Sequence, residues 1–110
     1  MSKLPTLSSE KDFKFLFRHA RKLENDTFKL WTSENSLPRH RFVFSVSLSV
    51  DKRSSIRNKL KRRAREWVRN NVKSGTRHLD FLLSFKKEAA RCSKSKFYEE
   101  LEKIFKEHRD

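Results

Sequence analysis

The stretch Asp51–Lys73 reads DKRSSIRNKLKRRAREWVRNNVK, and from Lys52 to Lys73 it carries ten Lys or Arg residues but a single acid, Glu66. Its apolar residues follow at the spacing i, i+4, i+8, i+11 and i+12: Ile56, Leu60, Ala64, Trp67 and Val68. An α-helix has about 3.6 residues per turn, so this spacing puts all of them on one side of a helix. The stretch therefore predicts a helix over about residues 55–73 that packs one side against a core.

The opposite side of this helix is strongly basic. At about 100° per residue, it contains Asn58, Lys61, Arg62, Arg65 and Arg69. A face that meets only water usually mixes charges of both signs four residues apart, whereas here like charges are neighbours and repel each other. A bound polyanion would neutralise that repulsion. The helix therefore predicts nucleic-acid binding, with exposed solubilising charge as the alternative for individual residues.

The composition favours a single domain, residues 1–110, with anionic partners. The chain carries a formal net charge of +14, and its ten Phe residues predict an aromatic-rich core. Nucleic acid is the first partner that this charge favours, and an acidic membrane surface is the second. No apolar run approaches the roughly 20 residues that span a bilayer. The start lacks a signal-peptide core and the lone Cys92 suits a reducing compartment, so we expect a cytoplasmic protein without a membrane partner.

The N-terminal half predicts one helix followed by two strands. A helix over residues 9–21 is indicated by apolar residues at helical spacing: Phe13, Leu16, Phe17 and Ala20. Residues 27–33 and 41–50 alternate between apolar and polar side chains, which predicts two strands. Because only a short loop joins these strands, we expect them to form an antiparallel pair. A further short strand is expected near residues 21–24.

The C-terminal half completes the predicted fold. The nearly continuous apolar run Leu79–Phe85 predicts a strand buried in the middle of the sheet. Residues 86–94 form a polar connection, and Ser95 is expected to cap a last helix. The sequence thus predicts an α+β fold in the order α-β-β-α-β-α, in which the basic helix crosses over between two strands of the sheet.

The sequence shows no site for catalytic chemistry of its own. The four His residues are scattered without metal-ligand spacing, and Asp12, Asp51 and Asp80 are isolated from one another. With Gly75 as the single glycine, there is no glycine-rich phosphate loop. We therefore expect no catalytic residue and no metal ligand in the protein. Any catalysis that it serves would need reactive groups from a partner.

The core of the basic helix, Arg57–Glu66, resembles the RNR signature of the bacterial ribonuclease P protein family, Arg-Asn-Arg-x-x-Lys/Arg followed by further basic residues. Lys59 stands where the family has the second Arg, and Lys lacks the planar fork of Arg. Before the helix, Leu48–Arg53 looks like the family's strand end, which usually has the form Val-Ser-Lys-Lys. Counted from there, the loop between Val50 and Arg57 is shorter than usual and lacks its glycine.

The resemblance covers about residues 7–106. Asp12 with Phe13 and Phe17 look like the aromatic pair on the family's first helix, and residues 27–31 and 80–83 look like two of its strands. The resemblance implies an α/β sandwich, similar to domain 2 of a ribosomal protein, with a left-handed β-α-β crossover that is opposite to the usual hand. No protein partner is evident.

The resemblance also implies a role. The protein would be the accessory subunit of an endoribonuclease whose large catalytic RNA removes the 5′ leader from precursor tRNA. Its partners would be ribonuclease P RNA and precursor tRNA, and the cofactor would be Mg²⁺, held mainly by the RNA, which activates the attacking water.

Contacts to the catalytic RNA are expected from the basic helix and the residues just before it. These candidates are Lys52, Arg53, Arg57, Asn58, Lys59, Lys61, Arg62, Arg65 and Arg69. Arg57 and Arg63 lie nearer to the apolar side of the helix and are expected along its flanks.

The 5′ leader is expected to stack on aromatic side chains outside this helix. The candidates are Phe13, Phe17 and Trp31. Core packing is the alternative for Phe13 and Phe17, which lie on the apolar side of their helix. Trp31 differs because it shares a strand face with Lys29.

Two other functions stay open at this point. A ribosomal or RNA-chaperone binding module with a similar basic fold would associate with ribosomes and would not prefer precursor tRNA to mature tRNA. A self-contained nuclease would cleave RNA without a partner, and changing one acid would abolish that activity.

Overall fold

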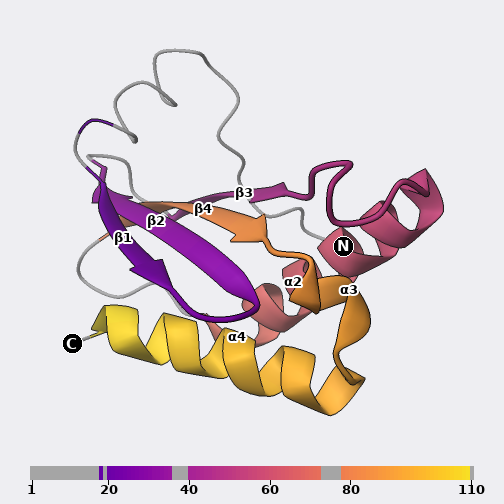
Figure 1. Cartoon of the computed structure of the whole chain (residues 1–110). Coiled ribbons are helices and arrows are strands. Elements are labelled where there is room, and N and C mark those ends of the chain that lie inside the picture. Colours follow the sequence, from indigo (N-terminus) through magenta and orange to yellow (C-terminus); the bar gives the residue numbers. More distant parts are fainter. Residues whose placement is uncertain (1–17, 19, 36–39, 73–77, 110) are drawn as a thin grey trace.

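The structure is a computed structural model and describes residues 18, 20–35, 40–72 and 78–109. Within these residues the elements follow in the order β1 (Arg21–Glu24), β2 (Phe28–Glu34), β3 (Arg41–Ser45), α2 (Ser54–Asn71), β4 (Leu79–Phe85), α3 (Glu88–Arg91) and α4 (Lys94–Arg109) (Figure 1). The predicted α+β class is therefore confirmed. The basic helix, the short strand near residue 21 and the apolar strand Leu79–Phe85 all lie where the sequence places them.

The four strands of the described part form one sheet in the order β1-β2-β4-β3. β4 pairs antiparallel with β2, so that Phe28 lies opposite Phe85, and parallel with β3, so that Arg41 lies opposite Asp80. The predicted antiparallel pair of β2 and β3 is therefore wrong, because β4 lies between them. Six of the seven residues of β4 are buried, and a strand that is apolar on both faces is most stable in the centre of a sheet.

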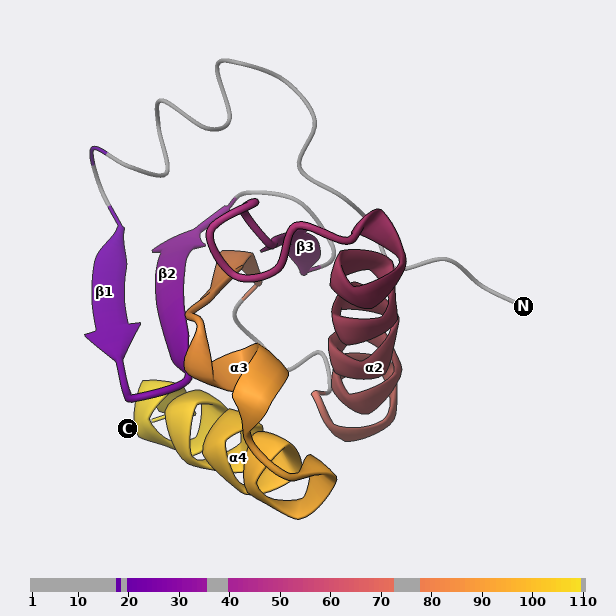
Figure 2. The same ribbon diagram turned by 45° about the vertical axis from the view of Figure 1, so that its right-hand side comes forward.

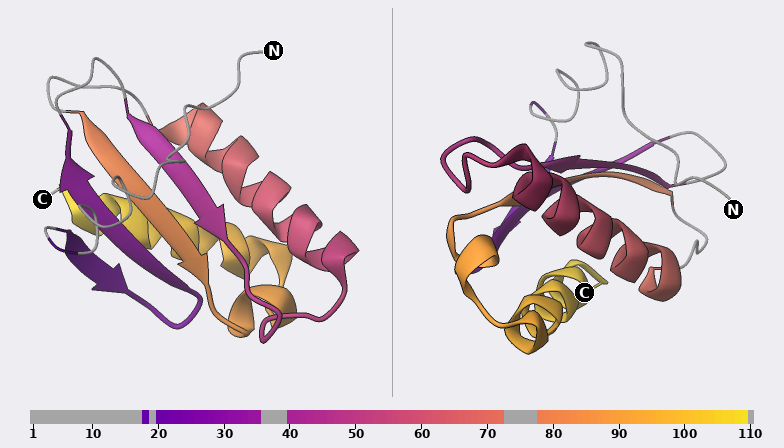
Figure 3. Two further views of the ribbon diagram at one scale, coloured as in Figure 1. Left: turned by 90° about the horizontal axis from the view of Figure 1, so that it is seen from above. Right: turned by 90° about the vertical axis from the view of Figure 1, so that its right-hand side faces the viewer.

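The helices α2 and α4 cover one face of the sheet (Figure 3, right). The core lies between the sheet and these helices. It consists of Phe28, Leu30, Phe42, Leu60, Ala64, Val68, Leu79, Phe81, Leu83, Phe85, Ala89, Phe97, Leu101, Ile104 and Phe105. At its centre the ring of Phe28 meets the rings of Phe85 and Phe97 edge-on, each at a centroid distance of 5.2 Å. The aromatic-rich core that the composition predicts is confirmed for this face.

The connection from β3 through α2 to β4 is a parallel crossover. In the left view of Figure 3 the sheet lies in front of the helices, β3 and β4 point the same way, and β4 lies to the left of β3. A chain that leaves β3, passes behind the sheet and returns to β4 at this position turns in a left-handed sense. This is the hand that the family resemblance implies, opposite to that of nearly all such connections.

Strand β3 ends earlier than predicted, at Ser45 instead of Val50. The alternating pattern continues beyond Ser45 because Val46 and Val50 still pack against the core. The chain is no longer a strand there, since the Val50 N–H donates to the Ser47 carbonyl and closes a turn. Residues 46–53 therefore join β3 to α2. The short loop expected from a strand end at Val50 starts earlier and is longer than expected.

Two other boundaries also differ from the prediction. The cap of α4 is Ser93 rather than Ser95, because the Ser93 Oγ accepts from the Lys96 N–H at 3.1 Å and the helix begins at Lys94. The predicted helix over residues 9–21 cannot extend to Arg21, which belongs to β1. The rest of that helix lies almost entirely outside the described residues, as do the leader candidates Phe13 and Phe17.

Candidate RNA-binding surface

Helix α2 presents one side to the core and the other to solvent. Leu60, Ala64 and Val68 are at most 4% exposed, so the predicted apolar side is the buried one. The candidates on the outer surface are either exposed or half-buried. Lys52, Arg53, Asn58, Lys59, Arg62 and Arg65 are exposed, and Arg57, Lys61 and Arg69 are half-buried. The structure thus places all nine on or just before one helix, which Figure 2 shows at the side of the molecule.

The basic residues of α2 are not equally available to a ligand. Arg65 lies over the ring of Phe44, with 5.7 Å from its guanidinium carbon to the ring centroid, which holds its charge at the edge of β3. Arg69 pairs with Glu66, and this hydrogen bond lowers the pKa of Glu66 and raises the pKa of Arg69. The Arg69 charge is therefore partly compensated within the protein.

Two arginines of α2 make contacts within the protein. Arg63 lies over the ring of Phe97 at 5.0 Å and so joins α2 to α4. Arg57 donates from Nη1 to the carbonyl oxygens of Asp51 and Lys52, at 2.9 Å each. Both positions agree with the expectation that these two side chains lie along the flanks of the apolar side. Arg57 therefore helps to hold the chain that leads into the helix.

Asp51, just before the helix, forms an ion pair with Arg53. Asp51 Oδ1 accepts from the Arg53 backbone N–H at 2.9 Å and from its Nε at 3.1 Å, and Asp51 Oδ2 accepts from its Nη2 at 3.0 Å. The bond from Arg53 lowers the pKa of Asp51, and the same bond raises the pKa of Arg53. The pair is therefore charged at neutral pH and is lost only in acid, as the pH falls through that lowered pKa. The sequence analysis names Asp51 but does not predict this turn, although an Asp two residues before a helix cap is a known turn signal.

A second surface lies on the face of the sheet away from the helices. There Trp31 is half-buried and packs with Ala20, Val43 and Leu82, in a cluster separate from the main core. The Lys22 Nζ lies over the Trp31 ring at 5.5 Å. Trp31 thus sits apart from Phe28 and Leu30, as its position in the alternating strand predicts.

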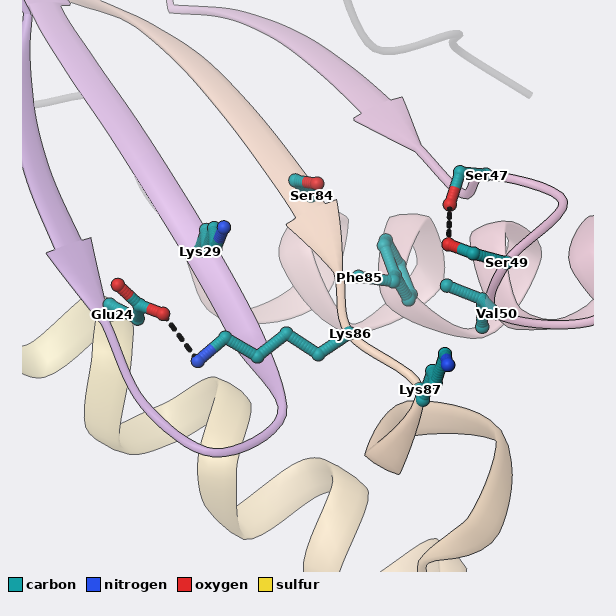
Figure 4. A pocket seen from close by; sticks show the side chains of 9 residues that line it. All are labelled: Glu24, Lys29, Ser47, Ser49, Val50, Ser84, Phe85, Lys86 and Lys87. Atoms are coloured by element: carbon teal, nitrogen blue, oxygen red, sulfur yellow. Dashed lines mark hydrogen bonds and ion pairs between the residues drawn. The ribbon is translucent and has the colours of Figure 1, made fainter.

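A hollow of about 410 Å³ opens at one end of the sheet (Figure 4). It is lined by Glu24, Lys29, Ser47, Ser49, Val50, Ser84, Phe85, Lys86 and Lys87. Lys86 Nζ pairs with Glu24 at 2.5 Å, and this bond lowers the pKa of Glu24. Three lysines and three hydroxyl groups make the hollow suitable for an anion. Sequence reasoning missed it because its residues come from four separate segments.

The described residues contain no group of three or more His, Cys, Asp or Glu side chains that could hold a metal ion. Within the same part of the chain, no helix is long and apolar enough to cross a membrane. Cys92 is half-buried, and this burial raises the pKa of its thiol, which makes it a poor nucleophile. His40 is buried and its Nδ1 accepts from the Leu79 N–H at 3.0 Å, a structural contact.

The fold and these surfaces define a small, basic α+β protein with a cationic helix beside a four-stranded sheet in its described part. The sequence matches the model of the Ribonuclease P family over residues 1–109. The ribonuclease P protein component of Aliivibrio fischeri is 33% identical over 99 residues, which span 90% of this chain and 84% of that protein. The chain belongs to the ribonuclease P protein family, as the RNR-like segment indicated.

Solved structures of the family have the same fold. The RNase P protein of Staphylococcus aureus superposes with a TM-score of 0.84 at 24% identity, and the match covers 94% of each chain. The RNase P protein from Thermotoga maritima superposes with a TM-score of 0.75 at 25% identity, over 87% of this chain and 90% of that one. These likenesses confirm the mixed α+β architecture.

Proposed function

We propose that this protein is the protein subunit of a cytoplasmic ribonuclease P. It binds the catalytic RNA and the 5′ leader of precursor tRNA, and it promotes endonucleolytic removal of the leader. The observation that carries this proposal is the cationic outer side of α2, which lies opposite the buried residues Leu60, Ala64 and Val68. Membership of the ribonuclease P family supplies the identity of the RNA.

The proposed division of labour assigns the chemistry to the RNA. Mg²⁺ held mainly by the RNA would, when bound, activate the water for hydrolysis of the phosphodiester. The residues of this chain bind and orient: the cations of α2 contact RNA phosphates, which gives affinity without requiring a particular sequence. No residue of the protein is proposed to be catalytic.

The leader is proposed to bind on the sheet face away from the helices. Trp31 offers a half-buried ring there, Lys29 lies on the neighbouring hollow, and Lys22 adds a positive charge above the ring. Aromatic rings stack on any base, so this surface would accept leaders of different sequence. Phe13 and Phe17, which lie outside the described residues, are proposed as further contacts of the leader.

The direct test is a cleavage assay with a bacterial ribonuclease P RNA and precursor tRNA at low Mg²⁺. We expect a trace of the protein to stimulate cleavage strongly over the RNA alone, because added cations reduce the repulsion between the two RNAs. An equal concentration of an unrelated basic protein is the control. No stimulation beyond that control would rule out the proposed role.

The second candidate is a ribosomal or RNA-chaperone binding module, which the general basicity of the chain also favours. Sequencing the RNA that copurifies with the tagged protein separates the two functions. The ribonuclease P role predicts enrichment of one catalytic RNA and of precursor tRNA, whereas the alternative predicts ribosomal RNA.

Replacing Trp31 by Ala is expected to weaken binding of precursor tRNA to the holoenzyme by about 1–3 kcal/mol, the usual effect of losing one stacked base. Mature tRNA, which has no leader, should bind as before. The measurement is the Kd of each tRNA with the assembled holoenzyme. Trp31→Phe is the matched control, since it keeps an aromatic face. Equal weakening for both tRNAs would place Trp31 outside the leader site.

A further inference from the structure

The three residues Asp51–Arg53 form a turn in which the carboxylate of Asp51 pairs with the guanidinium of Arg53. One carboxylate, Asp51, accepts from the backbone N–H and from two guanidinium nitrogens of Arg53, at 2.9–3.1 Å. The Asp51 side chain is only 15% exposed, although it lies in the most basic segment of the chain. By its charge alone, an acid beside a helix that binds a polyanion would weaken binding of that polyanion. The contacts of Asp51 within the turn give it a structural role instead.

Arg57 holds the same turn from the helix side. Its Nη1 donates to the carbonyl oxygens of both Asp51 and Lys52 at 2.9 Å. Helix α2 has no side-chain cap and no acid in its first turn. The Asp51 carboxylate accepts from the backbone N–H of the cap residue Arg53 and so places a negative charge close to this helix end. Asp51 and Arg57 thus fix the conformation of the backbone on both sides of Lys52.

These contacts divide the cations at the start of α2 into two kinds. The Arg53 guanidinium is occupied by Asp51, and the Arg57 guanidinium is occupied by backbone carbonyls. Lys52 lies between them, is exposed, and forms no ion pair within the described residues. The Arg53 side chain stays 71% exposed, but its charge is paired with Asp51, so within the described residues Lys52 is the exposed cation of this turn that has no ion-pair partner.

We propose that Asp51 and Arg57 are positioning residues for RNA binding, which fix the turn 51–53 so that Lys52 contacts an RNA phosphate while Arg53 is used within the protein. This proposal rests on the proposed function of α2 and adds which residues at its start bind and which orient. It narrows the expectation that Lys52, Arg53 and Arg57 all contact the catalytic RNA.

The test measures binding of ribonuclease P RNA to the full-length protein over a range of salt concentrations. Lys52→Ala should reduce the salt slope by about 0.9, the value for one phosphate contact. Arg53→Ala should leave the slope unchanged and should raise the pKa of Asp51 towards its ordinary value, as followed by NMR of the carboxyl carbon. If Arg53→Ala flattens the slope as much as Lys52→Ala does, the proposal is wrong.

Two substitutions of Asp51 separate the turn from the charge. Asp51→Ala removes both the turn contacts and the charge, and we expect weaker RNA binding although the net charge rises by one. When Lys52→Ala is added to Asp51→Ala, the affinity for the RNA should fall by less than about twofold. Asp51→Asn keeps an oxygen acceptor for the Arg53 N–H but releases the guanidinium. In that background Lys52→Ala should keep its full effect, and Arg53→Ala should now reduce the slope by about 0.9.

Glu102→Ala is the control, because it removes an exposed acid from α4 and should not weaken binding. Tighter binding by Asp51→Ala, with the effect of Lys52→Ala undiminished, would show that Asp51 acts only as a negative charge. Far-UV circular dichroism of each variant checks that α2 is intact. Failure of the wild-type protein to bind the RNA would contradict the proposed function itself, which is a different result from failure of the coupling between Asp51 and Lys52.

Discussion

Replacing Lys61, Arg62 and Arg65 together by Ala is expected to weaken binding of ribonuclease P RNA about 100-fold at 0.15 M salt. Each phosphate contact contributes about 0.9 to the salt slope, which amounts to about 0.7 logarithmic units of affinity at that salt concentration. If about five phosphates are contacted, the slope should change from about −4 to about −1.5. The measurement is a titration of the RNA at several salt concentrations.

The control for this triple variant changes the same net charge elsewhere. Lys94, Lys96 and Lys106 are exposed on α4, a different helix from α2. Their combined replacement by Ala should change the slope by much less than the α2 variant does. Equal effects of the two variants would show that the protein binds RNA through its overall charge, without a defined surface. Neither variant removes a buried side chain, so both should unfold close to the temperature of the wild type.

Replacing Asp80 by Ala is expected to destabilise the protein by about 3–5 kcal/mol, a large part of the 5–15 kcal/mol typical of a domain. The Asp80 side chain is 5% exposed and pairs with Arg41, whose side chain is 16% exposed. Asp80 accepts from Arg41 Nε at 2.8 Å, from Arg41 Nη2 at 2.7 Å and from Asn35 Nδ2 at 2.7 Å. The substitution leaves the half-buried Arg41 guanidinium without this carboxylate. Thermal unfolding followed by circular dichroism measures the effect.

The double variant Arg41→Met with Asp80→Leu is the control for this prediction. It removes both charges at once, so it should be less destabilised than Asp80→Ala alone. Arg41 and Asp80 are register partners in the parallel pair of β3 and β4, so the same experiment tests that pairing. A loss below about 1 kcal/mol for Asp80→Ala would mean that the carboxylate is solvated and the pair carries little stability.

Much of the fold follows from patterns that are local in the chain. Helix α2 lies at Ser54–Asn71, where apolar spacing predicts residues 55–73, and β4 has the predicted bounds Leu79–Phe85. Such patterns are reliable because they report which side of an element avoids water, and that depends only on neighbouring residues. The basic outer side of α2 is visible in the sequence for the same reason.

The wrong predictions concern contacts between segments distant in the sequence. A short loop between β2 and β3 favours a hairpin, but β4 pairs with both strands and separates them. Strand β3 ends at Ser45 although its alternation continues, because a turn keeps Val46 and Val50 on the core side. The hollow beside Lys29 likewise requires four segments to meet.

By itself, the sequence determined that this protein has a basic amphipathic helix, a central apolar strand, an aromatic core and the family to which it belongs. The tertiary structure alone decided the order of the strands and which cations of the basic segment are available. Arg63 lies over the ring of Phe97, Arg53 pairs with Asp51, and Arg57 donates to backbone carbonyls. Arg62, by contrast, is exposed. The reason is physical: a charge pattern counts cations, but only the folded chain shows which of them already have a partner.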